Sequence, residues 1–312
     1  EKWFPADFVV ECFPGQFRNW FYSLLALSTV MEDKAPFKTL LGHALVKDET
    51  GRDMHKSWGN AIWFDDAAEE IGVDVMRWMY ANQNIENNLL FGYGPANEVR
   101  RKLLTLWNVY SFFATYAAVD KFSPLEVNIK DSHLTLLDQW ILAKSNLLVK
   151  EAVSAFDSYR VDKFIQKFER FLDDLSNWYI RRNRRRFWKS ENDTDKEAAY
   201  DTLYHVLLIS VKIIAPILPF MSEKIYQNLV CNIDKNLPES VHLCEYPEID
   251  DQKIDQKMID QVDAIRKMVE LGRSARNKAE LKIRQPLQEL CFHLSDNSIK
   301  EFVIENQNII LE

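Results

Sequence analysis

The apolar positions divide the chain into a short mixed segment and a long helical one. Near the N-terminus, Ala6 to Phe13 carries apolar residues in series, which is typical of a buried strand, and Thr39 to Val46 alternates loosely as a second strand. Between them, apolar residues recur at helical spacing from about Gln16 to Met31. Strand, tight turn and helix in this order predict part of an α/β domain, which binds ligands at the carboxyl ends of its strands.

From Asn97 onward the apolar pattern is helical almost throughout. We expect long helices over residues 97–118, 134–159, 161–189 and 195–215 and a shorter one over 223–230. Short connections between long amphipathic helices predict an up-and-down bundle. Nearer the mixed segment, Asp74 is expected to cap a short helix that runs from Val75 to Ala81.

The last part of the chain is expected to form a small α+β unit. A polar linker over residues 236–251 precedes a helix from Ile259 to Ala279, a strand from Leu287 to Leu294 and a short helix from Ser298 to Val303. The patterns therefore predict a mainly α protein in three parts, with boundaries at residues 1–92, 93–250 and 251–312.

Composition narrows the class of protein. The 312 residues are 47% hydrophobic and 28% charged, as in an ordinary soluble protein of about two domains. A net charge of −8 argues against indiscriminate nucleic-acid binding, although not against a local basic site. Four cysteines without a Cys-x-x-Cys pair predict reduced thiols in a cytoplasmic protein and no bound zinc. The most apolar run, Val206 to Phe220, is too short for a membrane span, and a first residue other than methionine suggests a piece of a longer protein.

The stretch from Asp48 to Asn60 suits a mobile loop that closes on a polyphosphate. Lys56 supplies a positive charge, Ser57 a hydroxyl and Gly59 a flexible joint. A positive charge placed next to the negative charge that develops on a leaving pyrophosphate makes a large contribution to catalysis. Taken alone the motif is weak, because Ser and Gly mark ordinary surface turns as well.

Polar residues follow the first predicted strand, where a small molecule could bind. Glu11, Gln16 and Arg18 lie around the turn into the first helix. The alternative is that Glu11 and Arg18 form a solvated pair at the helix start.

The helix predicted from Val161 to Lys189 changes from apolar to basic along its length. Its apolar stripe over residues 171–179 is followed, on a largely overlapping face, by Arg181, Arg182, Arg185, Arg186 and Lys189, whereas Arg184 points elsewhere. Guanidinium groups at this density favour phosphate, and Trp178 offers a ring on which an unpaired base could stack. The alternative is ion pairing with carboxylates such as Asp173, Asp174, Glu191 or Asp193.

Three of these stretches resemble class I aminoacyl-tRNA synthetases. The loop Asp53-Met54-His55-Lys56-Ser57 is similar to their Lys-Met-Ser-Lys-Ser signature, with Asp53 and His55 as departures. Glu11 to Phe21 resembles the segment that holds the aminoacyl-adenylate, with Gly15 and Asn19 departing from it. Asp174 to Trp188 resembles the anticodon-stem helix of isoleucyl-tRNA synthetases. A fourth stretch, Glu270 to Leu287, resembles the same enzymes at the junction after their bundle.

The resemblance implies the C-terminal part of a Rossmann-like catalytic domain, an anticodon-binding helical bundle and a truncated tail. It implies activation of isoleucine by ATP with Mg²⁺, and transfer of isoleucine to its tRNA. Lys56 and Ser57 would act in catalysis, with Met54 and His55 beside the nucleotide. Glu11, Gln16 and Arg18 would contact the amino-acid adenylate, whereas Trp178 and the basic residues of the following helix would bind tRNA.

Two alternatives to this interpretation stay open. One is a non-catalytic synthetase-like module that binds tRNA, which the departures at Gly15 and Asp53 favour. The other is the equivalent piece of a valyl-type enzyme. We expect a monomer with no membrane partner that binds tRNA but, lacking the His-Ile-Gly-His segment and the editing insertion, does not aminoacylate by itself.

Overall fold

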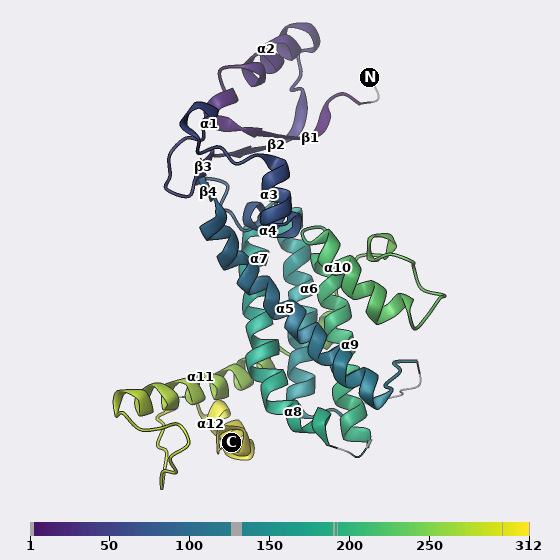
Figure 1. The fold of residues 1–312 in the computed structure, drawn as a ribbon, viewed down its shortest axis with the longest axis vertical. Helices are drawn as coiled ribbons and strands as arrows, with labels where there is room; N and C mark the ends of the chain where they lie inside the picture. The colour runs from purple at the N-terminus through teal and green to yellow at the C-terminus, as the bar shows by residue number, and fades with distance from the viewer. Residues whose placement is uncertain (1–2, 126–132, 190, 192, 295, 312) are drawn as a thin grey trace.

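The computed structural model describes residues 3–125, 133–189, 191, 193–294 and 296–311. A small α/β part lies at one end, a bundle of long helices forms the body, and a helical tail lies beside the far end of the bundle (Figure 1). The mainly α fold class predicted from the sequence is confirmed. No helix in these described ranges combines the length and apolar character that crossing a membrane would require.

The α/β part contains two pairs of parallel strands. Strand β1 (Ala6–Cys12) pairs with β2 (Phe37–His43), so that Ala6 faces Phe37 and Cys12 faces His43. Helices α1 (Phe13–Gln16) and α2 (Trp20–Glu32) connect these strands. The second pair is β3 (Val46–Asp48) with β4 (Leu89–Phe91).

The single strand expected over Thr39 to Val46 is wrong, because the chain changes partners in its middle. The amide of Ala44 donates to the Ile85 carbonyl at 2.8 Å, and that of Leu45 donates to the Asn88 side chain at 3.0 Å. The backbone thus leaves β1 at His43 and joins the β4 side at Val46. A change of partner of this kind depends on distant residues, so hydrophobic alternation cannot reveal it.

Two short helices connect the α/β part to the bundle. They are α3 (Phe64–Glu70) and α4 (Val73–Ala81). Asp74 lies inside α4 and does not cap it, contrary to the expectation. Its carboxylate instead accepts from the amides of Met221, at 2.7 Å, and Phe220, at 3.3 Å, which are unpaired donors in the first turn of a distant helix.

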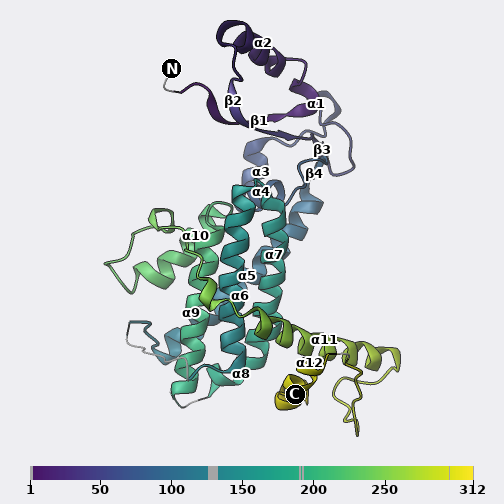
Figure 2. The ribbon, with the colours of Figure 1, turned by 180° about the vertical axis from the view of Figure 1, so that it is seen from behind.

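The bundle consists of four long helical segments that pack side by side (Figures 1 and 2). In chain order they are α5 (Tyr93–Asp120), α6 (Leu136–Asp157), α7 (Val161–Asp173) with its continuation, and α9 (Thr194–Ile214). A fifth segment combines α10 (Pro219–Tyr226) with a π-helical turn (Gln227–Cys231). Large side chains such as Trp78, Trp140 and Phe168 are fully buried between the segments, which confirms the predicted bundle.

The helix predicted over Val161 to Lys189 is continuous but not uniform. Between α7 and α8 (Arg181–Trp188), residues Asp174–Ile180 form a π-helix. A π-helix bonds each amide to the carbonyl five residues back, so it is wider than an α-helix and changes which later residues face the core. Asn183 and Phe187 are buried as a result, whereas Arg185 is exposed.

The tail is helical and irregular. Two 3₁₀ turns, Val241–Leu243 and Asp251–Lys253, precede α11 (Gln256–Lys278), α12 (Asn297–Glu305) and α13 (Asn308–Leu311). The strand expected over Leu287 to Leu294 does not form, because the described part of the tail contains no strand with which it could pair. The prediction of an α+β tail is therefore wrong, because the described part of the tail contains helices and no strand.

Candidate nucleotide loop and nucleic-acid interface

The Asp48–Asn60 loop is organised around one carboxylate. Asp48 Oδ1 accepts from the amides of Thr50 and Arg52, at 3.0 and 2.9 Å, and Asp48 Oδ2 accepts from Asn60 Nδ2 at 2.8 Å. The Asn60 side chain, with help from the Thr50 hydroxyl and the Arg52 amide, lowers the pKa of Asp48 far below its usual range. The two ends of the loop are thereby tied together, and the residues between them form its projecting part.

Lys56 and Ser57 lie in this projecting part and are exposed, in a 3₁₀ turn (Lys56–Trp58). Gly59 ends the turn at φ 69°, a left-handed conformation that favours glycine. The Lys56 ammonium lies 4.3 Å from the centroid of the Trp63 ring, and the His55 ring lies 4.2 Å from that of Trp58. The lysine therefore has an aromatic resting place without a carboxylate partner in the described chain, and it remains available to an anion.

Asp53 is the departure that would oppose phosphate binding if its charge were free. Its carboxylate forms an ion pair with Lys47, and that contact lowers the pKa of Asp53. Because Lys47 of β3 compensates the negative charge of Asp53, this charge does not oppose an anion at Lys56. Met54, the residue that follows Asp53, is half-buried.

At the end of β1, Glu11 is held by its neighbours. Its Oε2 accepts from Trp20 Nε1 at 2.8 Å and its Oε1 from the Cys12 amide at 2.7 Å. The alternative pairing of Glu11 with Arg18 is not among the ion pairs of the described residues, and Arg18 is exposed. The Gln16 side-chain oxygen is buried without a hydrogen-bond partner in the described chain, and a buried acceptor of this kind is available to a donor on a ligand.

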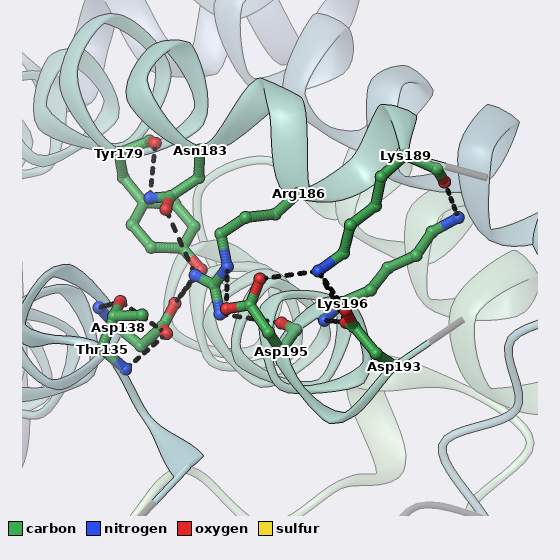
Figure 3. A network of polar contacts seen from close by, with 9 residues as sticks. All are labelled: Thr135, Asp138, Tyr179, Asn183, Arg186, Lys189, Asp193, Asp195 and Lys196. Atoms are coloured by element: carbon green, nitrogen blue, oxygen red, sulfur yellow. Dashed lines mark hydrogen bonds and ion pairs between the residues drawn. The ribbon is translucent and has the colours of Figure 1, made fainter. Parts of the chain in front are cut away.

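One side of α8 faces the bundle, and its cations form ion pairs with carboxylates there (Figure 3). Arg186 Nη1 donates to Asp138 Oδ1 at 2.8 Å, and its Nε lies 2.8 Å from Asp195 Oδ1. Tyr179 also donates to Asp138 Oδ1, at 2.6 Å. Burial by itself would lower the pKa of Arg186. The hydrogen bond to Asp138 outweighs the effect of burial, so that the pKa of Arg186 is raised. Burial and the same carboxylate raise the pKa of Tyr179 well above its usual range, so both groups keep their protons.

Lys189 belongs to the same internal network (Figure 3). Its ammonium lies 2.6 Å from Asp193 Oδ1 and 2.8 Å from Asp195 Oδ2. Lys196, which is 2% exposed, donates to the Lys189 carbonyl at 2.8 Å. For Arg186 and Lys189 the structure supports the alternative of internal ion pairing.

Trp178 is also internal, being 6% exposed. Its ring is packed between cations, with the Arg182 guanidinium 4.7 Å and the Arg266 guanidinium 5.6 Å from the ring centroid. Arg182 in addition donates to the Ile309 carbonyl of α13. Trp178 therefore has no face available to a base, and Arg182 attaches the tail to the bundle.

The opposite side of α8 is exposed and basic. Arg181, Arg184 and Arg185 have no carboxylate partner in the described chain. At about 100° per residue the three fall within an arc of about 100° that faces away from Asn183 and Phe187. Arg184, which the uniform helical spacing set aside, thus belongs to the exposed face. We call Arg181, Arg184 and Arg185 the outer arginines.

Asp138 and Arg184 are the residues that sequence reasoning missed. Asp138 lies three residues after Thr135, and the pair forms the capping box of α6. That spacing could have identified the cap but not its second use, since the contact with Arg186 spans 48 positions. Uniform spacing already turns Arg184 away from the apolar stripe, but only the π-helix explains why Arg181 and Arg185 lie on the same exposed side.

The described residues contain no group of three or more His, Cys, Asp or Glu side chains arranged to hold a metal ion. Mg²⁺, which the resemblance implies together with ATP, is therefore not matched by a ligand set in this part of the molecule.

Family models match both main parts of the chain. A model described as "tRNA synthetases class I (I, L, M and V)" matches residues 1–91, and one described as "Anticodon-binding domain of tRNA ligase" matches residues 138–291.

Similar proteins include two isoleucine–tRNA ligases. That of Clostridium novyi (strain NT) is 45% identical over 97% of this chain, and that of Pyrococcus furiosus is 36% identical over 100% of this chain. The chain spans 29% of the length of each of these relatives.

Solved structures with a similar fold include two synthetases of other specificity. A LeuRS from Agrobacterium radiobacter K84, in a ternary complex with tRNA and LeuAMS, matches 80% of this chain and 29% of its own with a TM-score of 0.62 and 16% identity. The methionyl-tRNA synthetase of Mycobacterium tuberculosis, in complex with methionyl-adenylate, matches 79% of this chain and 51% of its own with a TM-score of 0.59 and 19% identity. The resemblance noted in the sequence is confirmed: over nearly its whole length the chain is homologous to a portion of isoleucine–tRNA ligases, in which a class I synthetase segment precedes an anticodon-binding segment.

Proposed function

We propose that the chain supplies the mobile nucleotide loop and the tRNA-binding bundle of an isoleucine–tRNA ligase. The observation that carries the tRNA-binding proposal is the outer face of α8, where three guanidinium groups lack a carboxylate partner in the described chain. On the inner face, by contrast, the fold supplies carboxylates that neutralise arginine. Guanidinium groups left without such partners pair bidentately with phosphate oxygens.

The catalytic steps follow from the proposed role. A carboxylate oxygen of isoleucine attacks the α-phosphorus of ATP and releases pyrophosphate, and a ribose hydroxyl at the end of the tRNA then takes the acyl group and releases AMP. Lys56 and Ser57 would stabilise the charge that develops on pyrophosphate, with Met54 and His55 shaping the same turn. Glu11, Gln16 and Arg18 would contact the adenylate, for which the unpaired oxygen of Gln16 is a suitable acceptor. No step is assigned to Mg²⁺.

The division of labour follows the three parts of the chain. Residues 1–92 would serve the nucleotide, residues 93–250 the tRNA, and residues 251–312 would form the junction after the bundle. We propose a monomer that acts in the cytoplasm. The non-catalytic alternative loses one of its two supports, since Asp53 is paired with Lys47.

The salt dependence of tRNA binding tests this proposal. Replacing Arg181 and Arg185 together by glutamine should weaken binding of an isoleucine tRNA. It should also reduce the slope of log affinity against log salt by roughly 0.7–0.9 for each phosphate that the variant no longer neutralises. Filter binding between about 50 and 200 mM salt measures both quantities.

The matched control is Arg101→Gln, which removes an exposed arginine that pairs with Glu98 on α5. It should leave the affinity and the slope unchanged. Equal slopes for the wild-type chain and the Arg181/Arg185 variant would contradict the proposal.

A further inference from the structure

The outer face of α8 ends in an exposed aromatic ring. Trp188 is 53% exposed and is the last residue of the helix. Counting about 100° per residue, it falls between Arg181 and Arg184 around the helix axis. An isolated exposed ring is ordinary, whereas Trp188 has other rings and several cations around it.

The ring of Trp188 packs against other aromatic rings. Its centroid lies 6.4 Å from that of Tyr116 on α5, and Tyr116 lies 4.9 Å from Phe112. Phe112 in turn contacts Phe187, which is 1% exposed, at 5.2 Å. A series of ring contacts therefore connects the indole to the core. Because these contacts already restrict the side chain, little conformational entropy is lost when a ligand binds to it.

Cationic side chains lie close to Trp188. The Arg184 guanidinium lies 5.8 Å from the ring centroid, and Arg181 and Arg185 lie on the preceding turns of the same face. A rigid indole beside cations that lack carboxylate partners in the described chain matches a ligand that presents a flat ring and phosphates together. Unpaired nucleotides have this chemistry, because every base offers a stacking face and every linkage a negative charge.

We propose that Trp188 is a stacking platform for an unpaired base of the tRNA, with the adjacent phosphates bound by the outer arginines. This inference rests on the proposed tRNA-binding function and adds to it a residue and a kind of contact. Stacking does not require a particular base, so Trp188 distinguishes looped from paired RNA and leaves base identity to other contacts.

The test compares two RNAs and two substitutions. The RNAs are a stem-loop with the anticodon arm of an isoleucine tRNA and a duplex of equal charge without unpaired bases. Trp188→Ala should bind the stem-loop roughly tenfold more weakly than wild type, with an unchanged salt slope, whereas Trp188→Phe should stay within about threefold. Both variants should bind the duplex as the wild-type chain does.

Phe220→Ala is the matched control, since it removes a ring that is 66% exposed on α10. It should bind both RNAs as wild type, and thermal unfolding should show that all variants remain folded. Stem-loop binding unchanged in Trp188→Ala, or weakened equally on the duplex, would overturn the stacking proposal. If the wild-type chain binds neither RNA, it is instead the proposed function that fails.

Discussion

At the residue scale, Asp138 shows how a single buried carboxylate can support several elements. Its Oδ2 accepts from the amide and hydroxyl of Thr135, at 2.9 and 2.7 Å, which caps α6. Its Oδ1 accepts from Tyr179 and Arg186. A charge that is 0% exposed is tolerated only when it is paired and hydrogen-bonded, and here every partner lies on α6 or on the π-α8 segment.

Removing the cation of this pair should destabilise the bundle strongly. Arg186→Met leaves Asp138 buried without its charged partner and is expected to lower the free energy of unfolding by about 3–5 kcal/mol. Urea denaturation measures this change. Arg185→Met, one position earlier and exposed, is the control and should change it by less than about 0.5 kcal/mol. Similar losses in both variants would contradict the assignment of the two faces of α8.

The nucleotide loop should respond to acid through Asp48. Hydrogen bonds from Asn60, Thr50 and Arg52 lower the pKa of Asp48 in the folded chain. The ionised carboxylate therefore stabilises the loop fully at any pH above its ordinary pKa of 3.8. That stabilisation is lost as the pH falls below 3.8 toward the lowered value. Protection factors of the Thr50 and Arg52 amides, measured by hydrogen exchange from pH 6 downward, should fall over this range. They should be low at every pH in Asp48→Ala, and protection that does not depend on Asp48 would contradict the role given to it.

At the scale of elements, α8 separates its two faces because of the π-helix before it. The same helix carries an inner face of paired cations and an outer face that is basic and aromatic. Uniform helical spacing places Arg181 and Arg185 on the face of the apolar stripe, whereas the wider turn over Asp174–Ile180 turns them outward, to the exposed side where Arg184 lies. The proposed phosphate contacts and the proposed base contact thus share one face of an element whose opposite face is fixed in the core.

At the scale of the whole molecule, a second ionic cluster attaches the tail to the bundle. Asp174, in the π-helix, forms ion pairs with Lys144 of α6 and Arg266 of α11. Burial raises the pKa of Asp174, although both cations act in the opposite sense. Arg266 also lies 5.7 Å from the centroid of the Trp140 ring and 5.6 Å from that of Trp178. The direction in which α11 leaves the bundle (Figure 2) therefore depends on these contacts.

Removal of the central carboxylate of this cluster should loosen α11. Asp174→Ala leaves two partly buried cations sharing the weaker contacts with Asp263, at 3.3 and 3.5 Å, and is expected to cost about 3 kcal/mol. Hydrogen exchange along α11 should accelerate more than exchange in α5. Asp263→Ala removes a carboxylate that is 41% exposed and should cost less than about 1 kcal/mol. Equal exchange along α11 in wild type and Asp174→Ala would contradict this attachment.

The sequence by itself determined the elements whose causes are local. Apolar spacing predicted the bundle helices, and the lysine-bearing loop and the arginine-rich helix could be recognised as motifs. These features depend on residues within a few turns of one another, for which periodicity is a sufficient guide.

Only the tertiary structure decided which of the candidate side chains remain available. Asp74 caps a helix 146 positions away, the Thr39–Val46 stretch divides between two partner strands, and the Leu287–Leu294 stretch has no strand beside it in the described tail. Of the predicted tRNA-binding residues, Trp178 is buried and Arg186 and Lys189 pair with carboxylates of the fold, whereas Arg181 and Arg185 face outward. The physical reason is that an arginine is neutralised, or left available to phosphate, by carboxylates that the fold brings from elsewhere in the chain.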